Sequence, residues 1–452
     1  MPSPRAELWR NRSLRFALAG GATIATAVFG IARNKWVAQH LSTSGVGELA
    51  QVLSAQTWLG TATGMGLSLP IAQAIGAATA ARDELAVRRT MWTALVQVGG
   101  AALAIVAMGL LFAPWLSRAL LGTDTRAALM RISMLGVAGL ALSQAASGLF
   151  SGRSDVRTPL TQVVVGGITA VAVTIALVPR AGLVGGAIGA AVLLPAGLAG
   201  AFWLHRRDYR SAFVPRPRPS FDPGTARRLL PVGLAALTLA LVDQGTLLAV
   251  RSHFLRVNGI PANGLLQAAL ALSQQVGGVF YSYLASYAFG RISGAGGATG
   301  IRDYTQRQWA PVLGVAAVAF VAAMLLASPL LHLFYSERFD PARPMMAWAL
   351  FGEFCKVLVQ VWALGALPLG GRRLWMPIGL AYPVALAAAY LLLAPGRGAL
   401  SVPLATAAAG LVQLGLTGAL MSRHGVALRA SDFALLVVAV SGLGLLAWML
   451  AK

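Results

Sequence analysis

Charged residues are scarce in this chain, and acidic ones are the scarcest. Only 11% of its 452 residues are charged, and 14 acids stand against 36 lysines and arginines. A soluble protein of this length carries far more charge on its surface. The chain instead holds a dozen or so apolar runs of about 20 residues, each long enough to cross the roughly 30 Å hydrocarbon core of a bilayer. We therefore predict an all-α, polytopic membrane protein.

Cysteine is almost absent as well. The single Cys355 lies inside an apolar run, which excludes a disulfide framework and a cysteine metal site. The sequence also lacks an HExxH zinc motif, a Gly-Lys-Ser/Thr phosphate loop and a G-x-S-x-G elbow. We expect no enzyme activity, no metal and no cofactor. With no ATPase motif, the energy must come from an ion gradient, the membrane potential or a substrate gradient.

The net charge of +22 does not indicate a nucleic-acid partner, because the arginines are scattered through short loops. About twice as many basic residues fall on the side of the N-terminus as on the other side, which places the N-terminus in the cytoplasm. The first apolar run is too long for a cleavable signal, so we interpret it as the first span. Twelve spans are predicted, and a run at 432–450 is a candidate thirteenth. The twelve lie near 14–38, 46–78, 91–113, 128–151, 158–178, 183–204, 229–254, 262–290, 308–330, 344–369, 374–394 and 400–421.

The longest loop, "HRRDYRSAFVPRPRPSFDPGTARR", is rich in arginine and proline and covers 205–228. We interpret it as a cytoplasmic linker between an N-terminal six-helix lobe (1–204) and a C-terminal six-helix lobe (229–421). Residues 422–452 then form an additional C-terminal helix.

The two lobes have matching landmarks, which indicates an internal repeat. The members of each pair are separated by 217 to 219 residues: Arg33 and Arg251, Gln56 and Gln274, Trp92 and Trp309, and Gly152 and Gly371. Six spans per lobe is an even number, so the repeat is parallel. Such repeats are typical of transporters with a central cavity.

Three stretches resemble polysaccharide and O-antigen flippases of the Wzx type, within the multidrug/oligosaccharidyl-lipid/polysaccharide exporter superfamily. They are "IARNKWVAQHLSTSGVGELAQ", "QQVGGVFYSYLASYAFGRIS" and "LFGEFCKVLVQVWALGALPLGG". The resemblance covers nearly the whole chain, although the motifs are loose. It implies alternating access and a substrate that is an oligosaccharide on an undecaprenyl pyrophosphate carrier. The run at 432–450 and the arginine-rich linker depart from the family pattern.

An acid and a base, Glu353 and Lys356, lie three residues apart near the middle of the tenth predicted span. Because a bare charge there costs several kcal/mol, each must find a partner. One interpretation is a mutual ion pair that makes the helix tolerable. The other is that Lys356 faces a cavity and binds substrate phosphate, while Glu353 sets its protonation or couples an ion.

Other charged residues are candidates for the same chemistry. Asp243 is either a helix-contact residue or an ion-coupling site. Arg33, Lys35 and Arg251 stand near the outer ends of the repeat-equivalent first spans, where they either reach lipid headgroups or bind pyrophosphate. Glu48 could pair with one of these arginines.

Polar residues on the second and eighth spans are candidate sugar contacts, since amides and tyrosines suit hydroxyls and ring faces. They equally suit hydrogen bonds between helices. The set is Gln56, Gln274, Gln275 and Tyr281, with Tyr283 and Tyr287 nearby.

The sequence thus favours a flippase that moves a lipid-linked oligosaccharide across a bacterial inner membrane. The expected partners are this substrate, the membrane, a polysaccharide polymerase and a chain-length regulator. A lipid II flippase and a cation-coupled multidrug exporter of the same superfamily remain alternatives. The multidrug exporter would need a cavity rich in acids and poor in bases.

Overall fold

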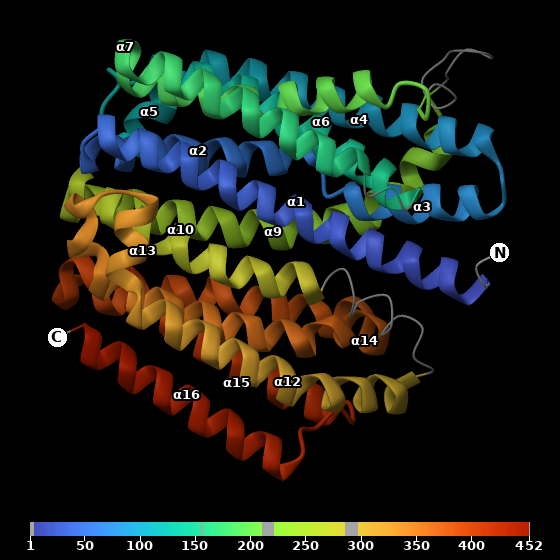
Figure 1. The fold of residues 1–452 in the computed structure, drawn as a ribbon. Coiled ribbons are helices and arrows are strands. Elements are labelled where there is room, and N and C mark those ends of the chain that lie inside the picture. The colour runs from blue at the N-terminus through green and yellow to red at the C-terminus, as the bar shows by residue number, and fades with distance from the viewer. Residues whose placement is uncertain (1–3, 154, 156, 210–220, 285–296, 452) are drawn as a thin grey trace. The chain divides into compact units, whose positions relative to one another are not determined.

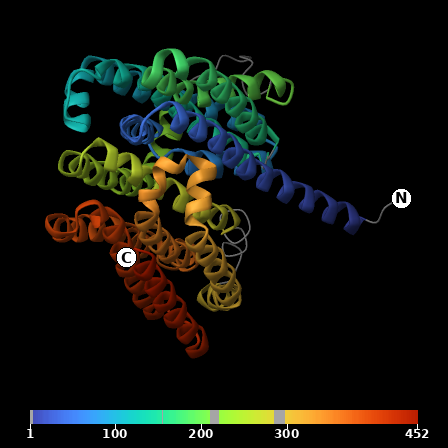
Figure 2. The ribbon, with the colours of Figure 1, turned by 60° about the vertical axis from the view of Figure 1, so that its left-hand side comes forward.

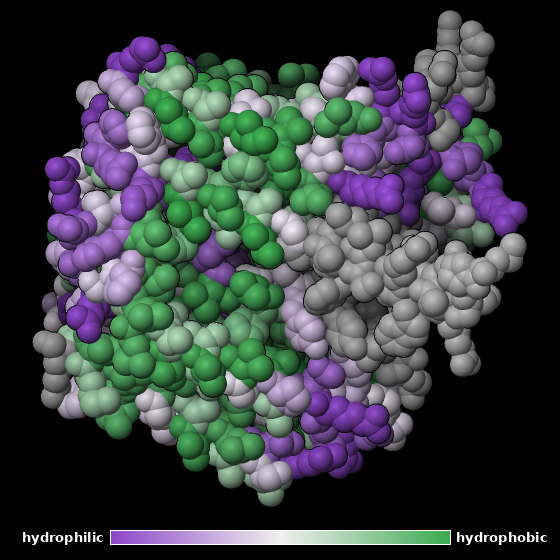
Figure 3. Space-filling model, viewed as in Figure 1, coloured by the Kyte–Doolittle hydropathy of each residue, from purple (hydrophilic) through white to green (hydrophobic). Residues whose placement is uncertain are grey.

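The computed structural model describes residues 4–153, 155, 157–209, 221–284 and 297–451. These residues form helices joined by short turns, with no β-strand among them, so the predicted all-α class is confirmed. Seven helical stretches within the described residues are long and apolar enough to cross a membrane. In Figure 3, hydrophobic side chains cover the middle of the helices, and hydrophilic ones gather toward their ends. The chain divides into two compact units.

Unit 1 contains residues 1–40 and Gln51–Leu241. Its helices, labelled in Figure 1, are α1 (Pro4–His40), most of α2 (Thr43–Gly64), α3 (Ser68–Ala80), α4 (Glu84–Leu111), α5 (Ala113–Leu121), α6 (Ala127–Gly152), α7 (Arg157–Leu204) and the first half of α9 (Pro223–Asn258). The core forms where α3, α4 and α6 pack together. Ile71, Met91 and Phe150 are among its fully buried side chains.

Unit 2 contains Leu41–Ala50 and residues 242–452. It holds the start of α2, the second half of α9, α10 (Ile260–Tyr283), α12 (Gly297–Leu325), α13 (Ala327–Phe334), a 3₁₀ turn (Glu337–Ala342), α14 (Arg343–Arg397), a second 3₁₀ turn (Gly398–Leu400), α15 (Ser401–Arg423) and α16 (Ala430–Leu450). Its core surrounds the first part of α14, where Phe320 and Phe354 are fully buried. The predicted thirteenth run is the helix α16, at the edge of this unit in Figures 1 and 2.

Glycines in the left-handed region break the two longest helices where the sequence predicts a change of span. Gly182 divides α7 (φ 54°, ψ −125°), and Gly371 divides α14 (φ 55°, ψ −147°). Gly398, with φ 49° and ψ −124°, ends α14. Gly182 and Gly398 occupy equivalent places in the repeat and have nearly the same dihedral angles. Left-handed backbone of this kind favours glycine, because it has no β-carbon to clash.

One predicted span is wrong as a single helix. The run 46–78 is two helices, α2 and α3, separated by a turn in which Met65 and Gly66 have positive φ values of 50° and 61°. The turn follows a close helix contact in unit 1, since a β-carbon on Gly66 would run into the carbonyl of Gly233 in α9. The run stays apolar through the turn, so hydropathy alone does not reveal it.

The predicted linker 205–228 falls partly on residues 210–220, which lie outside the described residues. The lobe boundaries stay a prediction. Tyr287 also lies outside the described residues.

Candidate functional site

An acid and a base share one face of the first arm of α14, which is the part before the break at Gly371. Glu353 is 6% exposed and lies against Gly277 of α10, where an added β-carbon would come 2.7 Å from its Cγ. Lys356 Nζ lies 3.6 Å from Glu353 Oε2. Residues three apart on a helix face the same way, so this ion pair forms within a single helix. The pair offsets much of the several kcal/mol that an isolated charge costs inside a membrane.

Two tyrosines complete the surroundings of the pair. The hydroxyl of Tyr281, on α10, donates a 2.7 Å hydrogen bond to Glu353 Oε1. Tyr382, on the second arm of α14, lies with its ring centroid 4.5 Å from Lys356 Nζ. An ammonium over an aromatic face is attracted by the ring quadrupole, most strongly where water is excluded. Each charged group therefore has a tyrosine as a second partner, in addition to the ion pair.

Asp243 of α9 joins this group through a small cavity of about 60 Å³. The lining residues are Asp243, Leu247, Leu270, Ser273, Gln274, Ala349, Glu353, Lys356, Tyr382 and Thr406. We call Asp243, Tyr281, Glu353, Lys356 and Tyr382 the acid–base cluster. The cavity has room for about two water molecules. With both acids ionised, the cluster carries one negative charge more than Lys356 balances.

Arg251 lies in the interior of unit 2 rather than on an open surface. Arg251 is 3% exposed, and its Nε and Nη2 both lie 3.4 Å from Asn263 Oδ1. Asn263 Nδ2 in turn donates to the carbonyl oxygen of Gly47 at 2.9 Å. Glu48, the next residue on α2, is also buried. A phosphate could reach Arg251 only if this network opened.

The other basic candidates lie on α1. Arg33 and Lys35 are half-buried near its C-terminal end, and each interacts with another residue. Neither is among the residues that line the acid–base cavity.

The candidate sugar contacts fall in different surroundings. Gln274 is exposed and lines the acid–base cavity, and Gln275 beside it is half-buried. Gln56 is buried in unit 1, with its amide against Gly136 of α6. Tyr281 binds Glu353 instead of standing free in a cavity. The structure thus brings Gln274 and Tyr281 to the cluster and leaves Gln56 in helix packing.

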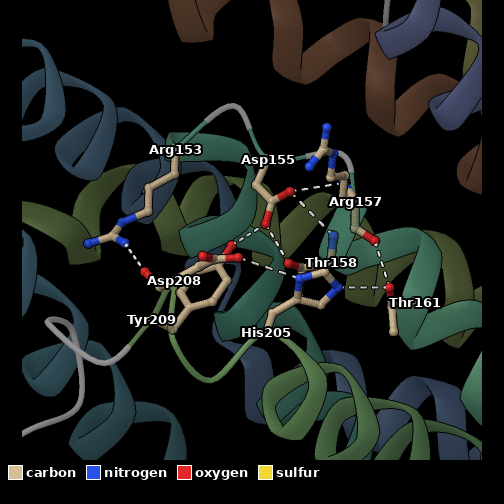
Figure 4. A network of polar contacts seen from close by, with 8 residues as sticks. All are labelled: Arg153, Asp155, Arg157, Thr158, Thr161, His205, Asp208 and Tyr209. Atoms are coloured by element: carbon tan, nitrogen blue, oxygen red, sulfur yellow. Dashed lines mark hydrogen bonds and ion pairs between the residues drawn. The ribbon is translucent and has the colours of Figure 1, made fainter.

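A second polar network lies where α7 begins and ends in unit 1 (Figure 4). Asp155 accepts hydrogen bonds from the backbone N–H of Arg157 at 2.8 Å, from the Thr158 hydroxyl at 2.5 Å, and from the Tyr209 hydroxyl. Burial acts to raise the pKa of Asp155, but the hydrogen bonds from Thr158 and Tyr209 outweigh it and hold that pKa below its ordinary value. Burial and the bond to Asp155 raise the pKa of Tyr209.

Arg153 extends this network to neighbouring helices. Its Nη2 lies 2.9 Å from Glu84 Oε2, its Nη1 donates to the carbonyl of Asp208, and its guanidinium lies 5.5 Å from the Tyr209 ring centroid. His205 contacts Thr161 across the two ends of α7 at 3.0 Å. The network ties both ends of this broken helix to the start of α4. Its contacts are internal, which indicates a structural role.

Two partners of the predicted charges, Tyr382 and Asn263, do not follow from the sequence, because each lies in a different span from the charge that it contacts. Asp155, which lies in a short loop at the centre of the second network, does not follow from it either. Polar residues inside apolar runs are a usable signal, but they do not say which helix faces which. Within the described residues, no group of three or more His, Cys, Asp or Glu side chains could hold a metal ion.

Comparison with known proteins identifies the fold. No protein-family model and no curated protein matches the sequence. Solved structures do match. The lipid II flippase MurJ in an inward closed conformation has a TM-score of 0.74 at 14% identity, over 95% of this chain and 92% of that one. An inward-facing multidrug resistance MATE family transporter of the MOP superfamily has a TM-score of 0.71 at 14% identity, over 88% and 95%.

A point mutant of the Vibrio cholerae MATE transporter VcmN has a TM-score of 0.64 at 15% identity, over 90% of this chain and 95% of that one. The chain therefore has the polytopic, all-helical fold shared by MATE and MurJ transporters. Because the sequence identities are only 14% to 15%, the similarity shows the fold alone.

Proposed function

We propose that this chain is a flippase that moves an undecaprenyl-pyrophosphate-linked oligosaccharide, such as an O-antigen repeat unit, from the cytoplasmic to the periplasmic leaflet by alternating access. The shared fold with a lipid flippase supports this proposal. The observation that carries it is Lys356, an ammonium held in the middle of an apolar helix with 26% of its side chain exposed. A membrane protein retains such a group at a cost of several kcal/mol, and binding an anionic substrate is a reason to retain it.

In the proposed mechanism, a phosphate oxygen competes with Glu353 for Lys356. The cavity of about 60 Å³ is too small for a pyrophosphate, so the phosphate approaches Lys356 from its exposed side. When the phosphate pairs with the Lys356 ammonium, Glu353 loses its counter-charge. Asp243, which lines the same cavity, is then a second acid without a base. Two unbalanced acids in an apolar environment favour uptake of a proton or a sodium ion. Substrate binding and ion binding are then coupled through the cluster.

The remaining candidates have secondary roles in this proposal. Arg33 and Lys35 are further candidates for binding phosphate, and Arg251 becomes available when its contact with Asn263 opens. Gln274 and Gln275 contact the sugars, and Tyr281 does so after leaving Glu353. Gln56 is available to a sugar only if it leaves its packing against Gly136. The protein works in the bacterial inner membrane with its N-terminus in the cytoplasm, alongside a polymerase and a chain-length regulator.

Two other functions follow from particular observations. The acid–base cluster has two acids and one base, which favours a cationic substrate and hence a multidrug exporter. The likeness to MurJ extends over 95% of the chain, which favours lipid II as the cargo. All three functions use alternating access and differ in the substrate.

Translocation in proteoliposomes distinguishes these functions. We expect the wild type to flip a pyrophosphate-linked oligosaccharide and Lys356→Ala to lose most of this activity. Arg118→Ala is the matched control, because Arg118 is 68% exposed and pairs with nearby Asp124. Undiminished flipping by Lys356→Ala would reduce the cluster to a structural ion pair. Transport of organic cations, or of lipid II alone, by the wild type would replace the proposed substrate.

A further inference from the structure

The C-terminal helix α16 packs against unit 2 along only part of its surface. Gly444 faces Phe351 of α14, with 3.4 Å between an added β-carbon and the ring. The loop before α16 is tied to α12, because Gln306 Nε2 donates to the carbonyl of Ala427 at 2.9 Å. Only 17% of the most apolar window of α16 is nevertheless buried. Much of this apolar helix therefore faces away from the described rest of the chain.

One face of α16 borders a groove of about 700 Å³ that separates it from α15. The lining residues are Trp362, Leu411, Leu414, Gly415, Gly418, Ala419, Ser422, Ala427, Leu428, Ala430, Phe433, Leu436, Val437, Val440 and Ser441. Almost all of them are apolar. On α15 the groove is lined by two leucines and four small residues, and a β-carbon added to Gly415 would meet no atom within 4 Å.

A second groove of about 550 Å³ continues from the first toward the end of α16. Leu411 lines both grooves, so they meet at this residue. The second groove has two tryptophans, Trp348 and Trp448, and one charged residue, Arg397, which is exposed. Tryptophan and arginine together are typical of the level of lipid headgroups.

The joined grooves, which we call the α16 trench, run along a helix of 21 residues. At 1.5 Å per residue this is about 30 Å, the thickness of the hydrocarbon core. Arg397 lies at one end, and Arg423 and Arg429 flank the loop at the other end. A basic group at each end and a meeting point near the middle correspond to two lipids, one from each leaflet.

We propose that the α16 trench binds membrane phospholipids with anionic headgroups, whose acyl chains fill the space between α15 and α16. The phosphate of one lipid binds Arg397, and that of the other binds Arg423 or Arg429. The lipids then fill the space between α16 and the rest of unit 2 and stabilise the position of this helix. This site is separate from the acid–base cavity and shares no lining residue with it.

Native mass spectrometry of the full chain, released from nanodiscs containing phosphatidylglycerol and phosphatidylcholine, tests this proposal. We expect the wild type to retain phosphatidylglycerol preferentially. Gly415→Leu should fill the first groove and lower the retained lipid, because its added side chain enters open space. Gly442→Leu is the matched control on α16. Its β-carbon also meets nothing within 4 Å, and Gly442 does not line the trench. Equal retention by the two variants would overturn the proposal.

The headgroup contact is tested by Arg397→Gln, with Arg338→Gln as the control, since Arg338 is exposed and lies outside the trench. One arginine near an anionic surface changes lipid affinity by about fivefold, so we expect a drop of that size for Arg397→Gln alone. Quenching of tryptophan fluorescence by phosphatidylglycerol with brominated chains gives a second readout in a folded sample. Equal retention of the two phospholipids, or their displacement by a polyprenyl phosphate at low concentration, would contradict the assignment.

Discussion

Lys356 pairs with a carboxylate, lies over an aromatic ring and lines a small cavity together with a second carboxylate. These three groups come from different parts of unit 2. Glu353 lies on the same helix, Tyr382 on the second arm of α14, and Asp243 on α9. The two interpretations that the sequence allows, an ion pair and a phosphate site, are therefore compatible. The structure shows the pair, and a phosphate would have to exchange with Glu353.

Removing Lys356 alone should be more damaging than removing the whole pair. Loss of Lys356 leaves Glu353 as an uncompensated buried charge, which costs about 3 kcal/mol. The double variant removes that charge and leaves Asp243 as the one remaining acid of the cluster. We expect Lys356→Met to lower the free energy of unfolding by that amount, and Glu353→Gln with Lys356→Met to recover at least half of the loss. Thermal unfolding in detergent measures both. A double variant no more stable than Lys356→Met would show that the two charges are not energetically coupled.

Asp155 should make stability depend on pH in the acid range. Its pKa is lowered in the folded protein, so its contribution is present above the unfolded value of about 4 and is lost as the pH falls through the lower folded value. We expect Asp155→Asn to lose about 1–2 kcal/mol at pH 7 and progressively less below pH 4 or so. Asp303→Asn, at an exposed acid, is the control. A loss that stays constant with pH would contradict this role.

The sequence predicts which residues carry the chemistry better than it predicts their partners. Glu353, Lys356 and Asp243 stand out because charges inside apolar runs are costly. Their contacts with Tyr382 and Tyr281 depend on how α9, α10 and the two arms of α14 are rotated, which hydropathy does not encode. Arg251 shows the same limit. Its repeat-equivalent position suggests a cavity, whereas Asn263, placed by the next helix, holds it in the interior.

Among the helices, α2 is divided between the two units after Ala50, so its first turns belong to unit 2. They are held there by a contact between repeat-equivalent glycines. A β-carbon on Gly47 would lie 2.5 Å from the carbonyl oxygen of Ile260 and 2.8 Å from the backbone nitrogen of Gly264. Asn263 adds its hydrogen bond to Gly47. The start of α2 is thereby fastened to the start of α10.

Gly264→Ala should loosen this contact. Its β-carbon would run into the carbonyl of Thr43, and overpacking of this kind typically costs 1–3 kcal/mol or so. Gly278→Ala on the same helix is the control, because its β-carbon meets nothing within 4 Å. We expect Gly278→Ala to leave the stability unchanged or to raise it slightly. Thermal unfolding measures the difference in stability between the two variants. Equal melting temperatures would exclude a tight contact at Gly47.

Helix positions are predicted well from apolar runs, and helix breaks are predicted poorly. The ends of α6, α15 and α16 lie within a few residues of the expected spans. The turn at Met65 was missed because its surroundings remain apolar, and the short helices α5 and α13 were missed because they follow α4 and α12 without a polar loop. Both short helices occupy equivalent places in the repeat, which supports a duplicated architecture beyond the sequence landmarks.

For the whole molecule, the buried Cys355 makes the predicted topology simple to test. Because Cys355 is fully buried, a membrane-impermeant thiol reagent should leave the wild type unlabelled. We expect Ser422→Cys to be labelled from the cytoplasmic side and Gly396→Cys from the opposite side, since both positions are exposed. Intact and inverted vesicles distinguish the sides. Labelling of both positions from one side would overturn the assignment of α15 as a span.

The ion pair in α14 also has a consequence for how the chain enters the membrane. Lys or Asp at the centre of a span costs about 2.5–3.5 kcal/mol on insertion through the translocon. The helix with Glu353 and Lys356 carries its own counter-charge and can be neutralised as soon as it forms. Asp243 has no basic residue within one turn of it in the sequence of α9, and its companions in the cluster are synthesised later. Asp243 can therefore gain the lysine of its cluster only after α14 has been synthesised.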